Sequence, residues 1–150
     1  MSTLASHKKA RFDYDILETL EAGLVLTGAE VKAIRQGSAK LDGSFVIIRG
    51  TQATIVNMHI GPYRYARTEK YVPDITRKLL LNRKEINYLR GKSEEDGLTI
   101  VPLSLYTRGA RIKIEIGIAK GKKNYDKRRS IKEKENKQSL QRAVKYGQDD

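Results

Sequence analysis

The sequence contains no cysteine, so it can form neither disulfide bonds nor a metal site built on thiolates. It also lacks long apolar runs, and no segment approaches the ~20 apolar residues that a transmembrane helix needs. Residues 1–9 lack the apolar core of a secretory signal. We therefore expect a cytoplasmic protein that does not insert into a membrane.

Groups that carry out chemistry in enzymes are also scarce. There are two histidines, His7 and His59, and no glycine-rich phosphate loop follows a strand-like segment. No spacing typical of metal ligands occurs. The carboxylates of residues 94–96 precede Gly97, as in a solvated turn. We therefore expect no catalytic residue, no cofactor and no bound metal.

What the sequence has in excess is positive charge. Its 150 residues include 30 Lys and Arg against 18 Asp and Glu, a net charge of +12. A compact domain this cationic repels itself, which favours a polyanionic partner. Nucleic acid is the first candidate, because phosphate neutralisation with counterion release drives such binding. An anionic membrane surface is the alternative, and the short apolar runs weaken it.

The clearest strand pattern lies in residues 111–118, where four isoleucines occupy every second position. This alternation puts one face in a core and leaves Lys113 and Glu115 on the other face. Residues 98–106 are the expected partner strand. Pro102 cannot donate a ladder hydrogen bond and so marks an edge or a bulge. The side chains expected to point inward from the partner strand are Val101, Leu103 and Leu105.

Other segments extend this β pattern. Residues 45–49 and 53–58 are typical of a hairpin across Gly50 and Thr51. Residues 14–26 form a long strand pattern that changes phase near Leu17, as a bent barrel strand does.

Two capping boxes predict short helices among the strands. Residues 27–30 begin one helix, which Gly37 ends, and residues 82–85 begin a second. Strands at hairpin spacing with helices at two junctions predict a mainly β fold. Its architecture is a small antiparallel barrel with two or three short peripheral helices, rather than a doubly wound sheet.

Composition divides the chain into three parts. Residues 1–12 are expected to be a flexible arm, residues 13–120 the barrel and residues 121–150 a basic tail. The tail holds ten Lys or Arg and five Asp or Glu, with few large apolar residues. A stretch this polar forms only a marginal helix in water. We expect it to be disordered when free and to order on a partner.

Residues 122–129 hold the densest basic cluster, with five positive charges around Tyr125. Such cations can position RNA phosphates while the tyrosine ring stacks on an unpaired base. The alternative is a tail that only adds solubility.

Residues 77–84 form a second basic patch, in which one or two of the three leucines are expected to pack in the core. A loop further upstream either touches RNA or is an ordinary surface loop. It holds Tyr63, Arg64, Tyr65, Arg67 and Tyr71.

Six stretches, in this order and spacing, resemble the family of SsrA-binding proteins, also called small protein B. They are residues 14–23, 26–32, 57–60, 77–82 (RKLLLN), 97–103 and 119–128 (AKGKKNYDKR), and the resemblance spans residues 8–145. It implies an oligonucleotide-binding (OB-like) barrel, in agreement with the strand pattern. It also implies binding to the transfer-RNA-like domain of transfer-messenger RNA, the RNA of bacterial trans-translation.

The resemblance implies four RNA-binding residues in the barrel: Glu21, Leu80, Asn82 and Lys113. A carboxylate can accept from base amino groups, an amide can bind a base edge or a sugar hydroxyl, and an ammonium group can neutralise phosphate. Leu80 would offer an apolar surface. The alternatives are burial for Leu80, helix N-capping for Asn82, and ordinary exposed strand charges for the other two.

The resemblance also implies a role for the tail in the vacant messenger channel of a stalled small ribosomal subunit. There the tail would fold into a helix, with Tyr125 stacked on a ribosomal base. The tail residues concerned are Gly121, Lys122, Lys123, Tyr125, Asp126, Lys127 and Arg128. Two departures from relatives concern residues 73–77, which hold fewer arginines, and Asn136, where some relatives have tryptophan.

The resulting hypothesis is a two-ended adaptor for ribosome rescue and the tagging of incomplete polypeptides. The barrel would hold transfer-messenger RNA, and the tail would sense the empty messenger channel at the decoding centre. Elongation factor Tu with GTP would deliver the complex with alanyl-transfer-messenger RNA, and the ribosome would form the peptide bond. The rivals are a structural ribosomal or ribosome-assembly protein with the same barrel, and an RNA-modifying enzyme.

Overall fold

The computed structural model describes residues 2–66 and 70–122. Within these residues the chain forms nine strands and three helices. In order they are β1 (Thr3–Ser6), α1 (Ala10–Asp13), β2 (Tyr14–Leu24), α2 (Gly28–Arg35), β3 (Ala39–Lys40), β4 (Phe45–Arg49), β5 (Gln52–Val56), β6 (His59–Ile60), β7 (Arg77–Leu80), α3 (Arg83–Ser93), β8 (Leu98–Arg108) and β9 (Arg111–Gly121). The mainly β fold with short helices is confirmed.

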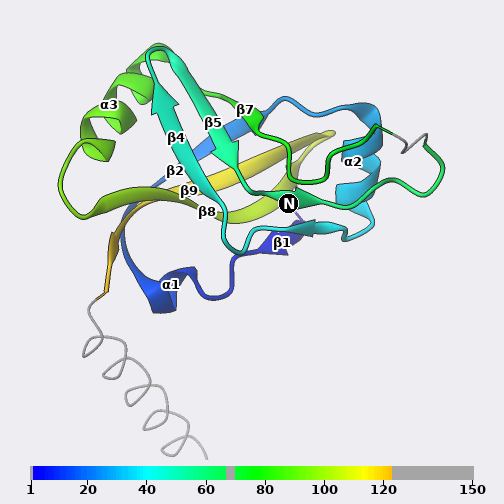
Figure 1. Ribbon diagram of the computed structural model, residues 1–150, viewed down its shortest axis with the longest axis horizontal. Coiled ribbons are helices and arrows are strands. Elements are labelled where there is room, and N and C mark those ends of the chain that lie inside the picture. Colours follow the sequence, from blue (N-terminus) through cyan, green and yellow to red (C-terminus); the bar gives the residue numbers. More distant parts are fainter. Residues whose placement is uncertain (1, 67–69, 123–150) are drawn as a thin grey trace, which may run out of the picture.

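The main sheet closes on itself, as Figure 1 shows. Its strands follow the order β1-β8-β4-β5-β7-β2-β9, and β9 pairs again with β8. Every pairing in it is antiparallel. This ring is consistent with the OB-like barrel expected from the sequence. Helices α2 and α3 lie at opposite ends of the molecule (Figure 1). Among the described residues, no helix is both long enough and apolar enough to span a membrane.

The isoleucine strand is the centre of the barrel wall. All four isoleucines of β9 are buried: Ile112, Ile114, Ile116 and Ile118. Strand β9 pairs with β2 on one side and β8 on the other, so Lys113 and Glu115 between the isoleucines face outward. The predicted hairpin of β4 and β5 is also confirmed, with Arg49 opposite Gln52.

Bulges bend the two long partner strands of β9. In β2 the register shifts between Ile16 and Glu18, which leaves Leu17 exposed. The predicted phase change near Leu17 is therefore confirmed. In β8 the register shifts between Pro102 and Ser104, so the proline marks a bulge, as its missing N–H group predicts.

The bulge in β8 also corrects one expectation. Val101, Leu103 and Leu105 are all buried, but they do not share one face. Leu105 lies in the main core, whereas Val101 and Leu103 belong to a second cluster with Ala10 of α1. A bulge adds one residue to the strand and so reverses the inward phase.

The N-terminal segment differs from the expected flexible arm. Strand β1 pairs with β8, with Thr3 opposite Tyr106. His7 then donates from Nδ1 to the carbonyl of Pro102 at 3.0 Å, and Ala10 is buried. A short polar segment can join a sheet because backbone hydrogen bonds with β8 need no particular side chains.

Both predicted capping boxes are present. At the start of α2, Oγ1 of Thr27 accepts the N–H of Glu30 at 3.2 Å, and Oε1 of Glu30 accepts the N–H of Thr27 at 3.0 Å. The helix ends before Gly37, whose φ of +84° is a left-handed conformation that favours glycine.

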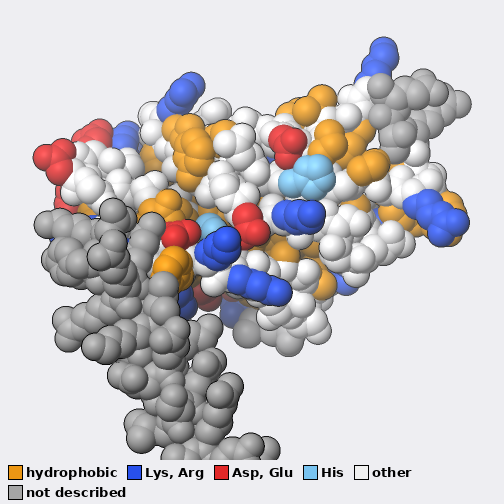
Figure 2. Space-filling view, turned by 60° about the horizontal axis from the view of Figure 1, so that its bottom comes forward, with side chains coloured by type: hydrophobic (Ala, Val, Ile, Leu, Met, Phe, Trp, Pro, Cys, Tyr) orange, Lys and Arg blue, Asp and Glu red, His pale blue; other side chains and the backbone are white. Residues whose placement is uncertain are grey.

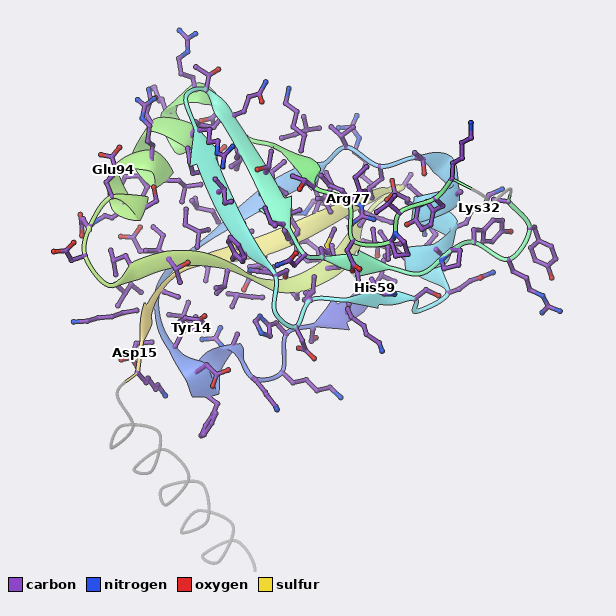
Figure 3. The ribbon with its side chains drawn as sticks, in the orientation of Figure 1. Tyr14, Asp15, Lys32, His59, Arg77 and Glu94 are labelled. Atoms are coloured by element: carbon purple, nitrogen blue, oxygen red, sulfur yellow. The ribbon has the colours of Figure 1, made fainter. Side chains whose placement is uncertain are left out.

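Glu30 has a second role that its capping position does not indicate. Its Oε2 accepts from Nε of Arg77 at 2.6 Å, and both side chains are buried. Arg77 also donates to the carbonyls of Met58 at 2.6 Å and Pro73 at 2.8 Å. Figure 3 shows Arg77 at the start of β7, where the loop from β6 ends. The expected basic patch of residues 77–84 therefore loses Arg77, which is an internal anchor.

The capping hydrogen bond and the ion pair together keep Glu30 charged. Burial acts to raise the pKa of Glu30, but hydrogen bonds from the Thr27 backbone and from Arg77, together with the charge of Arg77, outweigh it. The pKa of Glu30 therefore lies below its ordinary value.

Candidate nucleic-acid interface

Three strand residues and one residue at the start of a helix line an open depression on the outside of the barrel. They are Glu21 of β2, Leu80 of β7, Asn82 before α3 and Lys113 of β9. The depression has a volume of about 500 Å³. These are the four barrel residues that the family resemblance implied, and the structure brings all four together. We call this site the outer-face depression.

Strand register explains why they meet. Gly23 of β2 lies opposite Lys113 of β9 on one side and opposite Leu80 of β7 on the other. Glu21 is two residues before Gly23, so its side chain lies on the same face of the sheet. Three strands that are distant in sequence thus place an acceptor, an apolar group and a cation side by side.

Gly23 forms the floor between Leu80 and Lys113. A Cβ atom at this position would lie 3.1 Å from Cβ of Leu80 and 3.6 Å from Nζ of Lys113. The absent side chain therefore lets the other two approach. In the described part of the chain Lys113 forms no ion pair, so its ammonium group can take an external anion.

The three leucines of the RKLLLN stretch have different environments. Leu79 is 1% exposed and lies in the core, whereas Leu80 is 53% exposed. Core packing is thus confirmed for Leu79, and the burial alternative for Leu80 is wrong. Successive residues of a strand point to opposite faces, which accounts for the difference.

This contrast leads to a stability prediction for two neighbouring leucines. Leu79→Ala is expected to lower the free energy of unfolding by roughly 2–5 kcal/mol, because it leaves a cavity. Leu80→Ala should change it by at most about 0.5 kcal/mol, because the side chain is largely solvated. Urea unfolding of both variants measures the difference. A large loss in Leu80→Ala would mean that this leucine serves the core.

Asn82 caps the N-terminus of α3. Helix capping was the alternative to an RNA-binding role for this residue. Its Oδ1 accepts the N–H of Glu85 at 2.8 Å, and Oε1 of Glu85 accepts the N–H of Asn82 at 3.1 Å. Capping uses only the oxygen of the amide. Within the described residues, Nδ2 donates to no other group and remains able to bind an acceptor in the depression. The two roles of Asn82 are therefore compatible.

Glu21 is held in place by two side chains of β8. The hydroxyl of Tyr106 donates to Oε2 of Glu21, and Nη2 of Arg108 lies 3.4 Å from the same oxygen. Burial, then the hydrogen bond to Glu21 and the charge of Glu21, raise the pKa of Tyr106 to about 12. The phenol therefore stays protonated and donating at neutral pH, and Oε1 of Glu21 can accept from a ligand.

Sequence reasoning missed Tyr106 and Arg108 as supports of Glu21. The feature that could have indicated their role is the register of β8 on β9, in which Tyr106 lies opposite Lys113. A second recess of about 410 Å³ adjoins the depression and shares Glu21 with it. No group of three or more His, Asp or Glu among the described residues is arranged to hold a metal ion.

The predicted tail residues fall on both sides of the boundary of the described chain. Gly121 is the last residue of β9, and the N–H of Lys122 donates to the carbonyl of Asp13 at 3.0 Å. These two residues continue the barrel rather than begin the tail. The other tail residues, Lys123, Tyr125, Asp126, Lys127 and Arg128, lie outside the described residues, as do Arg67 and Asn136.

The closed antiparallel barrel has the architecture of an OB-like fold, with an open depression on its outer face. A profile of the SmpB protein family matches residues 4–146. The chain belongs to this family.

Individual relatives agree with this assignment. The chain is 49% identical over 142 residues to the SsrA-binding protein of Gloeobacter violaceus, covering 95% of this chain and 93% of the relative. It is 50% identical over 141 residues to the SsrA-binding protein of Streptomyces avermitilis, covering 94% and 80%. A solved structure described as "tmRNA-SmpB: a journey to the center of the bacterial ribosome" matches with a TM-score of 0.68 and 41% identity, covering 79% of this chain and 84% of that one.

Proposed function

We propose that this protein binds the transfer-RNA-like domain of transfer-messenger RNA and delivers that RNA to stalled ribosomes in trans-translation. The observation that carries the proposal is that Glu21, Leu80, Asn82 and Lys113 line one depression in a chain of the SmpB family. The relatives named SsrA-binding protein and the ribosomal SmpB structure support the same partner.

Each group of the outer-face depression has a distinct task in this proposal. Glu21 accepts from exposed base amino groups, with its orientation held by Tyr106. Asn82 donates from Nδ2 to a base edge or a ribose hydroxyl. Leu80 packs against a ribose or base, and Lys113 neutralises a phosphate. The protein binds and orients RNA and makes no bond itself.

The proposal assigns the basic tail to the ribosome. Residues from Lys123 onward enter the empty messenger channel of the small subunit and order there, and messenger RNA in the channel excludes them by sterics and charge. Ordering carries a backbone entropy cost, so many phosphates and stacking surfaces must converge for it to occur. Elongation factor Tu with GTP brings the alanyl-RNA complex, and the ribosome forms the peptide bond. The site of action is the cytoplasm.

A charge reversal tests the barrel half of the proposal. Lys113→Glu is expected to weaken binding to transfer-messenger RNA by about 10- to 150-fold, because a charge-assisted hydrogen bond contributes about 1.5–3 kcal/mol. The slope of log affinity against log salt should fall by about one unit. Filter binding or fluorescence anisotropy over a range of salt concentrations measures both quantities.

Lys120→Glu is the matched control. Lys120 is an exposed residue of the same strand, and it does not line the depression. It should weaken binding less than Lys113→Glu does. Equal loss in both variants, or an unchanged salt slope in Lys113→Glu, would remove Lys113 from the interface.

A pull-down separates the proposal from a structural ribosomal protein. The adaptor should co-purify from bacterial lysate with one small structured RNA, identified by sequencing. A structural ribosomal protein would instead be present on every ribosome in equal amount.

A further inference from the structure

A group of aromatic and cationic side chains lies at the α2 end of the barrel, outside the depression. The ring centroids of Tyr63 and Tyr65 are 5.5 Å apart in an edge contact. Arg64 lies over the Tyr65 ring at 5.6 Å, and Nζ of Lys32 lies over the Tyr63 ring at 5.5 Å. We call these four residues the tyrosine–cation cluster. At 73% exposure, Tyr65 is the most exposed large apolar side chain among the described residues.

The loop that carries the cluster is attached to the barrel at both ends. At its start, the N–H of Gly61 donates to the carbonyl of Ser38 at 2.9 Å. At its end, Nη2 of Arg77 holds the carbonyl of Pro73, and the hydroxyl of Tyr71 donates to the carbonyl of Ile60 at 2.8 Å. Figure 1 shows the loop passing α2 and projecting beyond it. A loop fixed at its base loses less entropy when it binds a ligand.

The charge around the cluster favours a polyanion. Helix α2 and residues 61–66 and 70–72 contribute four cations: Lys32, Arg35, Arg64 and Lys70. The one carboxylate in these segments is Glu30, which is buried and paired with Arg77. Lys and Arg side chains project at this end of the molecule in Figure 2, and Figure 3 labels Lys32 there.

Tyr88 also has a cation over its ring, but its surroundings carry negative charge. Nζ of Lys92 lies 5.8 Å from the ring centroid of Tyr88 on α3. However, the Tyr88 hydroxyl donates to Glu18, and Lys92 pairs with Glu95 at 3.4 Å. Two carboxylates beside this ring would repel phosphate. Helix α2 and residues 61–66 and 70–72 contain no exposed carboxylate, and Asp74, further along the loop, pairs with His59.

We propose that the tyrosine–cation cluster is a second RNA site, which takes one unpaired nucleotide. The base stacks on the exposed ring of Tyr65, and Arg64 and Lys32 contact its phosphates. Bases in a duplex are already stacked on their neighbours, so the site selects single-stranded RNA. This inference rests on the proposed function only in taking RNA as the partner, and it does not depend on the four residues of the depression.

The absence of tryptophan from the sequence makes a direct test possible. Tyr65→Trp introduces the only indole, whose fluorescence is quenched when a base stacks on it. A short single-stranded RNA should quench this emission, and the same RNA annealed to its complement should quench it much less. Tyr88→Trp is the matched control, and the single strand should leave its emission nearly unchanged. Adding Lys113→Glu to Tyr65→Trp should leave the quenching in place, which separates this site from the depression.

Binding measurements with the same single strand complete the test. Tyr65→Ala is expected to weaken affinity about tenfold, and Tyr65→Phe to retain it, because stacking needs the ring and not the hydroxyl. Equal quenching at positions 65 and 88, equal quenching by duplex, or unchanged affinity in Tyr65→Ala would overturn the proposal. Quenching by an acidic peptide without quenching by RNA would overturn it in favour of a protein partner.

Discussion

Arg77→Met is expected to lower the free energy of unfolding by roughly 3–5 kcal/mol, because it leaves a buried carboxylate without its partner. Glu30 would keep its capping bond but lose the guanidinium that neutralises it. The carbonyls of Met58 and Pro73 would lose donors as well. Such a loss is a large share of the about 5–15 kcal/mol that stabilises a typical domain. Urea unfolding followed by circular dichroism measures it.

Two further variants identify the ion pair as the cause. Lys78→Met removes an exposed cation from the next position of β7 and should change stability by at most about 0.5 kcal/mol. The double variant Glu30→Gln, Arg77→Met should be more stable than Arg77→Met alone. Glutamine is neutral, and it can still complete the capping box with Thr27. A double variant as unstable as the single one would show that the carbonyl contacts, and not the charge, dominate.

The same ion pair has a defined pH dependence. The pKa of Glu30 in the folded protein lies below its ordinary value of 4.5. A depressed carboxyl pKa stabilises the fold above the unfolded-state pKa, and this stabilisation is lost as the pH falls through the folded-state pKa. The stability difference between the parent protein and Arg77→Met should therefore shrink in acid. A constant difference down to low pH would contradict the assignment.

Replacing Tyr125, Asp126, Lys127 and Arg128 together with alanine is expected to abolish trans-translation while leaving RNA affinity unchanged. In the proposed function these residues contact the ribosome, and the barrel alone holds transfer-messenger RNA. Affinity is measured with the isolated RNA. Activity is measured as addition of the tag to a polypeptide stalled on a messenger that lacks a stop codon.

Matched variants make the division of surfaces testable in both directions. Alanine at residues 148–150, at the far end of the tail, should retain tagging if the Tyr125 segment carries the ribosomal contacts. Lys113→Glu should show the opposite defect, with lost RNA affinity. Loss of RNA affinity in the tail variant would contradict the proposal that barrel and tail act on different partners.

The arginine-poor stretch 73–77 has a structural explanation. Asp74 pairs with His59 at 3.0 Å, and the Pro73 carbonyl accepts from Arg77. This stretch attaches the loop to the barrel instead of presenting a basic surface. The exposed cations of the region, Arg64 and Lys32, lie beside the tyrosines.

Local features of the sequence were sufficient for much of the fold. Four alternating isoleucines predicted β9, because the side-chain period of a strand is two. The phase change at Leu17 predicted the bulge in β2, and the missing N–H of Pro102 predicted an edge or a bulge in β8. Thr27 with Glu30, and Asn82 with Glu85, predicted where two helices begin, since a capping box involves residues only three positions apart.

The candidate site was predicted by a different route. The resemblance supplied Glu21, Leu80, Asn82 and Lys113, but strand pattern alone left burial open for Leu80 and ordinary surface charge open for Glu21. Only the pairing of β7, β2 and β9 across Gly23 put these side chains in one depression. The support that Tyr106 gives to Glu21 spans 85 positions in the chain.

The sequence by itself thus determined the strand periods, the bulges, the helix starts and the excess of positive charge, because each depends on neighbouring residues or on composition. Tertiary structure alone decided that Arg77 is buried against Glu30, 47 positions away, and that residues 3–6 join the sheet. It also decided which cations remain free for RNA. The physical reason is that a charge is buried or exposed according to partners that only the closed barrel brings within hydrogen-bonding distance.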